Sequence, residues 1–135
     1  MSDNTSVALK AVQTAAYSTL SGHLTGSLYD EVPKTAVFPY TTFGDMSEAE
    51  LEARGVKGRI CYIQLRVHSR DQGGKFQVYT IMAEIVEHLT AAKLSITGWK
   101  EIWKTYRAGT VVAVEKDPGA YLGVVQFLIA VCKST

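Results

Sequence analysis

The sequence predicts an α+β protein, with a mainly antiparallel sheet of about four to five strands packed by two helices. Apolar residues recur at helical spacing in two segments, at about 6–20 and 75–92. Strict alternation of apolar and polar residues over 61–68 indicates a strand with one buried face. With 135 residues, the chain is expected to form a single domain, 1–135.

The first helix is expected to run to about Leu20, with Ser6 or Thr5 as its N-cap. A proline-containing segment follows, in which Pro33 and Pro39 exclude helix. Aromatic and β-branched residues around Pro39 predict a strand that starts at or just after this proline.

Residues 45–58 are highly charged, lie between glycines and offer few apolar side chains for burial. We therefore interpret them as a long connection, or mobile arm, rather than as a strand or helix. Such an arm is expected to become ordered on contact with a neighbour, so its deletion should leave a folded protein.

The clearest element is the strand in which Cys61, Ile63, Leu65 and Val67 alternate with polar neighbours. The helix over about 75–92 is expected to cover this sheet, with Phe76 and Tyr79 broadening its apolar stripe.

Three further segments complete the sheet. Bulky residues on both sides of 99–107 predict a strand, which Gly109 is expected to bulge or break before it resumes at 111–115. The turn Asp117-Pro118-Gly119 precedes a final strand, 121–132, that is apolar on both faces except at Gln126. Such a strand lies centrally in a sheet, or its second face meets another subunit.

Composition narrows the class of function. Fourteen basic and thirteen acidic residues nearly cancel, whereas a dedicated nucleic-acid binder carries a basic excess. The polar N-terminus predicts no signal peptide, and no apolar run suits a membrane. Cys61 and Cys132 are expected to be reduced, buried thiols, with a cross-strand contact between them as the alternative.

No pattern in the chain supports catalysis, a metal or a cofactor. The sequence lacks a nucleophile elbow, a phosphate-binding loop and a dinucleotide fingerprint. His23 and His68 have no partner at ligand spacing, and His88 suits the end of a helix dipole. We expect no enzyme activity, no metal and no cofactor.

Aromatic and basic residues of the strands allow two interpretations. Trp99, Trp103, Tyr106 and Tyr62 suit either core packing or a subunit interface. A second group suits either a solvated face or a basic strip near DNA; its members are Arg66, Arg70, Lys100, Lys104 and Arg107.

The order of these elements, with several short motifs, resembles the phage tail completion (tail terminator) proteins of long-tailed siphophages and related gene transfer agents. The matching pieces are Leu28-Tyr29-Asp30 with Val32-Pro33, Phe38-Pro39-Tyr40, Val67-His68-Ser69-Arg70, the helix after Gly73-Gly74, and Asp117-Pro118-Gly119. His68 stands where an aromatic residue is common in the family.

This resemblance implies a homo-hexameric ring at the head-proximal end of the virion tail, assembled in the host cytoplasm. The ring would cap the tail tube and end its polymerisation. It would contact tail-tube protein and a head-tail connector or head completion protein, and genomic DNA would pass its lumen without sequence-specific binding.

The site residues are then interface residues rather than catalytic ones. They are expected to be Asp45, Met46, Glu48, Glu50, Leu51, Arg54, Tyr62, Arg66, His68, Arg70, Trp99 and Trp103. The alternatives are another neck component, or a small-molecule-binding module with a pocket between the second helix and the Trp99–Tyr106 strand.

Overall fold

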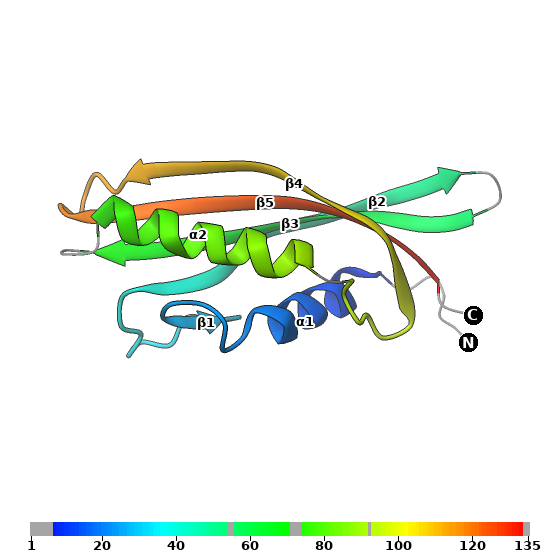
Figure 1. Cartoon of the computed structure of the whole chain (residues 1–135), viewed down its shortest axis with the longest axis horizontal. Coiled ribbons are helices and arrows are strands. Elements are labelled where there is room, and N and C mark those ends of the chain that lie inside the picture. Colours follow the sequence, from blue (N-terminus) through cyan, green and yellow to red (C-terminus); the bar gives the residue numbers. More distant parts are fainter. Residues whose placement is uncertain (1–6, 54–55, 71–73, 92, 134–135) are drawn as a thin grey trace.

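The structure is a computed structural model that describes residues 7–53, 56–70, 74–91 and 93–133. Two helices pack on one face of a five-stranded sheet (Figure 1). The elements are α1 (Leu9–Leu20), β1 (Ser27–Tyr29), β2 (Tyr40–Ala53), β3 (Val56–Arg70), α2 (Gly74–Ala91), β4 (Trp99–Ala113) and β5 (Ala120–Lys133). The predicted α+β class and the two helices are confirmed.

The strand order is β1-β2-β3-β5-β4, and every neighbouring pair is antiparallel except β1–β2. The last strand, β5, lies between β3 and β4, so the prediction of a central position is confirmed. Its helix-side residues are buried in the core, whereas Leu122, Val124, Gln126 and Leu128 on its other face are half-buried.

The core lies between the sheet and the helices. Alternate residues of β3 and β5 point towards α2, and a built Cβ on Gly123 of β5 would lie only 2.4 Å from Val78 Cγ1. The helix therefore packs very close to this strand. The largest fully buried side chains are those of Phe127, Leu20, Ile63, Leu65, Ile81, Ile85, Leu89, Ile129, Val12, Val67, Val78 and Val125.

The prediction of an irregular arm at 45–58 is wrong. Residues 45–53 belong to β2 and residues 56–58 to β3, and these strands pair with each other from Met46↔Ile63 to Ala53↔Val56. Glutamate and alanine have low strand propensity, so the residues of this segment do not by themselves predict a strand. Cross-strand pairing with β3 overrides this local preference. The hairpin end projects beyond β5 (Figure 1), since β3 first pairs with β5 at Gly58↔Cys132.

The position of the irregularity in β4 also differs from the prediction. Gly109 pairs regularly with Val125, and the register shifts lie between Glu101 and Trp103 and between Tyr106 and Ala108. β4 therefore runs unbroken to Ala113, with a bulge on each side of its central stretch.

The predicted N-cap of the first helix is not the one that the structure describes. Ser6 lies outside the described residues, and Ala8 occupies the N-cap position without a side-chain hydrogen bond. Glu48 of β2 supplies the missing acceptor: its Oε1 accepts hydrogen bonds from the backbone N–H groups of Ala8 (2.9 Å) and Leu9 (3.0 Å). A carboxylate at this position also complements the positive end of the helix dipole.

Candidate assembly surface

The side of the sheet opposite the helices, called the open face below, is covered by no element of the described residues (Figure 1). The registers Tyr62↔Leu128 and Gln64↔Gln126 place these side chains on one side of two central strands. The open-face residues of these strands are half-buried, except for Gln64, which is buried; they are Tyr62, Gln64, Arg66 and His68 of β3, and Leu122, Val124, Gln126 and Leu128 of β5. An extended, partly apolar surface in the middle of a sheet is typical of a protein interface.

A hollow of about 520 Å³ lies on this face. Its lining is mixed and consists of Ser47, Glu48, Ala49, Ile60, Tyr62, Arg107, Gln126 and Leu128. A broad hollow with both apolar and polar lining suits a side chain or segment of another protein.

A polar network stands at the centre of the open face, where the register of β2 shifts between Phe43 and Met46. Gln64 Nε2 donates to the Tyr62 hydroxyl (3.0 Å), and Gln64 Oε1 accepts from Arg66 Nε (2.8 Å). Arg66 Nη2 also lies 3.7 Å from Asp45 Oδ2. These contacts hold three predicted interface residues, Asp45, Tyr62 and Arg66, in one cluster.

Gly44 leaves room for this network. A Cβ at Gly44 would lie 2.2 Å from Gln64 Oε1 and 2.7 Å from Arg66 Nε. Both atoms belong to the ends of flexible side chains, so an added methyl group would displace these contacts rather than the backbone.

Aromatic side chains gather at the other end of the same face. The Tyr40 ring stacks on His68 at a centroid distance of 4.6 Å, and Phe38 and Tyr29 lie 5.3 and 6.0 Å from Tyr40. Burial, and secondarily the positive charge of Arg66, lowers the pKa of His68 from its ordinary value of 6.5. His68 therefore acts as a neutral ring within an aromatic cluster rather than as a surface cation.

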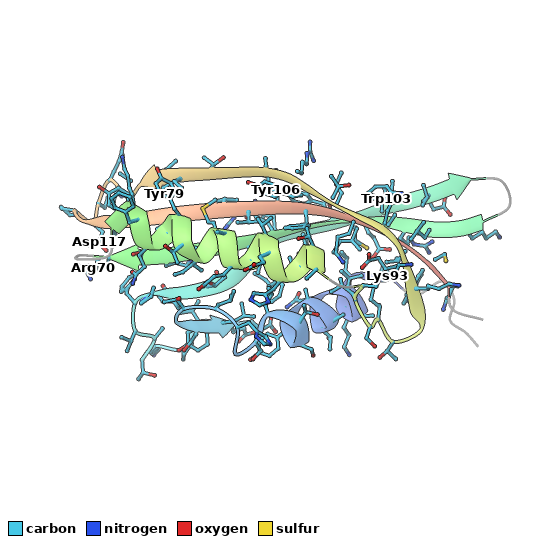
Figure 2. All side chains as sticks on the ribbon, viewed as in Figure 1. Arg70, Tyr79, Lys93, Trp103, Tyr106 and Asp117 are labelled. Carbon is cyan, nitrogen blue, oxygen red and sulfur yellow. The ribbon has the colours of Figure 1, made fainter. Side chains whose placement is uncertain are left out.

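The proline-containing segment builds this cluster. Phe38 and Tyr40 flank Pro39, and β2 starts at Tyr40, so the prediction of a strand just after Pro39 is confirmed. Arg70 lies over the Phe38 ring at 5.7 Å, and its Nη2 lies 2.7 Å from Asp117 Oδ1 (Figure 2). Arg70 thus ties the end of β3 to the turn before β5.

Three predicted interface residues lie on the helix side of the sheet instead. Met46 packs against the core, Trp99 is 6% exposed, and Glu48 anchors α1 while its Oε2 lies 3.0 Å from Arg59 Nε. Arg59 and Lys133 both lie over the Trp99 ring. Their contacts are internal ones that stabilise the fold.

Glu50 and Leu51 lie near the end of the β2–β3 hairpin, where Glu50 is exposed and Leu51 is half-buried. Arg54, also predicted as an interface residue, lies outside the described residues. The hairpin end therefore adds a projecting element to the open face.

The edge strand β4 presents a second exposed group. Trp103 and Tyr106 (Figure 2) are 39% and 42% exposed, and the bulge before Trp103 turns this residue to the side opposite Trp99. Lys104, predicted within a basic strip, is instead buried and its Nζ lies 2.9 Å from Glu101 Oε1. An exposed basic strip that includes Lys104 is therefore excluded.

The sequence interpretation missed several exposed apolar residues. Ile102 and Val112 of β4 are 39% and 47% exposed, and Phe76 and Tyr79 of α2 are 83% and 51% exposed rather than part of the buried stripe. The signal that could have revealed the two helix residues is their helical position, because Phe76 lies about 160° and Tyr79 about 100° around the helix from Val78.

The described residues hold no group of three or more side chains suited to a metal ion. Cys61 and Cys132 are both free thiols, but only Cys61 is buried as expected, whereas Cys132 is half-buried. Burial raises the pKa of Cys61 to about 12. In the described part of the chain, no helix is long and apolar enough to cross a membrane.

Known proteins with the same fold and a matching family identify the relatives of this chain. No curated protein matches the chain. A chain in the solved structure titled "Virion of native gene transfer agent (GTA) particle" has the same fold, with a TM-score of 0.81 and 19% sequence identity over 93% of this chain and 98% of that chain. A model of the family "Tail completion protein gp17" matches residues 8–131. This match spans almost the whole chain, which therefore belongs to the tail completion protein gp17 family and is a structural protein of the phage virion tail.

Proposed function

We propose that the chain caps the tail tube, ends its polymerisation and joins the tail to the head connector as a homo-hexameric ring. The open face is the observation that carries the proposal. It is the only side of the sheet without a covering layer in the described residues, and it combines a hollow of mixed lining with a hydrogen-bonded polar centre.

The partners follow from this role. The ring contacts other copies of the chain, the last ring of tail-tube protein, and the head-tail connector or head completion protein. Genomic DNA passes through the lumen without sequence-specific binding, in keeping with a formal net charge of only +1.

A tube-elongation assay tests the capping step directly. Purified chain is added to growing tubes of tail-tube protein, and tube lengths are measured by electron microscopy. Elongation should stop at about six chains per tube end, as expected for one ring on each end. Continued elongation at saturating amounts of a folded chain would refute the capping role.

A shortened hairpin separates joining from folding. Replacing residues 52–57 with an Asn-Gly turn between Leu51 and Gly58 removes two cross-strand pairs, which preserves the alternation of hydrogen-bonded pairs, and leaves the Glu48–Arg59 contact in place. The variant should fold normally but fail to join heads to tails. Normal joining would show that the hairpin end has no part in it.

The alternative of a small-molecule-binding module is not favoured. Its predicted pocket lies between α2 and β4, where a Cβ on Gly109 would meet Tyr106 Oη at 2.4 Å and Met82 Cε at 3.0 Å. Side chains fill this part of the groove. The alternative of another neck component would be preferred if the chain bound connector protein but ignored tubes.

A further inference from the structure

Three strand edges have no partner strand among the described residues, and that of β1 is only three residues long. β4 pairs only with β5, so its outer edge is free along 99–113. On the opposite side, β1 pairs with β2 only from Tyr40 to Thr42, which leaves the outer edge of β2 without a partner strand at 46–53. Backbone N–H and C=O groups on such edges are ready to pair with another strand.

We propose that the β2 edge of one copy, at 46–53, pairs with the β4 edge of a second copy, so that one sheet continues from subunit to subunit. This inference rests on the proposed ring and specifies its subunit contact. A partner on β4 would also cover apolar side chains that water now contacts, those of Ile102, Trp103, Tyr106 and Val112.

The charges of the two strands favour this combination of edges. β2 carries four carboxylates and no lysine or arginine, a formal charge of −4, whereas β4 carries three cations and one carboxylate, a formal charge of +2. Arg59 already pairs with Glu48, and Lys104 with Glu101. Among the side chains that the structure describes, the exposed charges left on the segments 46–53 and 99–113 are Glu50 on β2, and Lys100 and Arg107 on β4. The two cations lie about 23 Å apart along the strand, so Glu50 can meet only one of them.

The same charges disfavour symmetric pairing. Two β2 edges would bring carboxylates together, and two β4 edges, each with a formal charge of +2, would bring cations of one copy towards cations of the other. A β2-to-β4 contact is heterologous, and a heterologous contact closes into a ring when its rotation matches the symmetry. The geometry of the edges thus favours cyclic assembly over a two-fold dimer.

The two bulges of β4 restrict the pairing region. Such bulges are a common protection against unwanted edge pairing. Between and beyond them, the stretches 103–106 and 108–113 keep a regular register with β5. A partner strand would pair most regularly along these two stretches, with Arg107 in the bulge between them and Lys100 before the first bulge.

Charge reversal tests the pairing. Glu50→Lys alone, and Lys100→Glu with Arg107→Glu, should each raise the protein concentration needed for ring formation at least about tenfold, because like charges would face each other. The chain that carries all three changes should assemble within about threefold of the wild type, since the pair is restored with opposite signs. Matched controls are Glu31→Lys and Lys34→Glu, which reverse exposed charges between β1 and β2 and should assemble normally.

Hydrogen exchange provides a readout specific to the backbone. Outward-pointing amides of 46–53 and of β4 should exchange more slowly in the ring than in the monomer, because every second residue of a new antiparallel or parallel ladder gains a partner. Thermal unfolding of each variant confirms that the monomer is intact.

The outcomes separate the two proposals. If the wild type forms no ring, alone or on tube ends, both the proposed function and this contact are refuted. If rings form but the reversed variants assemble normally, or the edge amides gain no protection, only the β2–β4 contact is refuted.

Discussion

Leu128 and Ile129 are neighbours on β5, yet they belong to different parts of the molecule. Ile129 is fully buried beneath the helices, whereas Leu128 is half-buried on the open face and lines its hollow. The same alternation separates Ile63 from Tyr62 on β3. One set of strands thus provides a folding core on one side and a candidate assembly surface on the other.

The two leucine-sized side chains provide the largest expected difference. Ile129→Ala removes fully buried methyl groups and should lower the free energy of unfolding by about 2–5 kcal/mol. Leu128→Ala should cost less than about 2 kcal/mol, because its side chain is only partly removed from water. Chemical denaturation measures both. Equal losses would mean that the open face stabilises the monomer as strongly as the core does.

Glycines on the two sides sharpen the contrast. Gly123→Ala places a Cβ 2.4 Å from Val78 Cγ1 and 2.8 Å from Met82 Sδ. The helix must move, so a loss of about 1–3 kcal/mol in unfolding free energy is expected. The added Cβ of Gly44→Ala meets only the flexible ends of Gln64 and Arg66. The unfolding free energy should fall by about 1 kcal/mol, because the hydrogen bond from Arg66 Nε to Gln64 Oε1 is lost. A larger loss for Gly44→Ala in denaturation would contradict this ranking.

Glu48 and Glu50 lie two residues apart on β2 and differ in the same way. Glu48→Ala removes the acceptor for the first N–H groups of α1 and should lower the unfolding free energy by about 1–2 kcal/mol. Glu50→Ala changes an exposed side chain and should stay within about 0.5 kcal/mol. If both variants unfold alike, the carboxylate of Glu48 does not anchor the helix.

The smallest effect concerns the open face itself. The pKa of His68 is lowered in the folded state, so between this lowered pKa and 6.5 the unfolded chain binds more protons than the folded chain. Stability should therefore rise with pH across this window and lose this contribution as the pH falls through it. Denaturation curves at several pH values measure the unfolding free energy, and His68→Gln should remove its rise with pH across this window. If the unfolding free energy of the variant rises with pH as steeply as that of the wild type, His68 is not the source of the rise.

How far the sequence predicts this molecule depends on what sets each element. The alternation from Cys61 to His68 predicts β3, because the apolar residues of the buried face recur at every second position of the strand's own sequence. The β2 half of the hairpin lacks such a pattern, since glutamate at 48 and 50 alternates with alanine and leucine rather than with strong strand formers. Pairing with β3, which no local pattern contains, decides its structure.

The candidate surface was predicted in part for the same reason. Tyr62, Arg66 and His68 were placed correctly on one side of β3, where the alternation is unbroken. Trp99 and Trp103 were placed on one side of their strand, but the bulge between Glu101 and Trp103 separates them. A bulge depends on the neighbouring strand and leaves no clear local signal when no glycine marks it.

The proposed ring is tested most directly by the solution mass of the chain, measured by light scattering across a concentration series, alone and with tail tubes. We expect rings of about six times the chain mass of 14.8 kDa, either in solution or on tube ends. A chain that stays monomeric at every concentration and does not bind tubes would contradict the proposed ring.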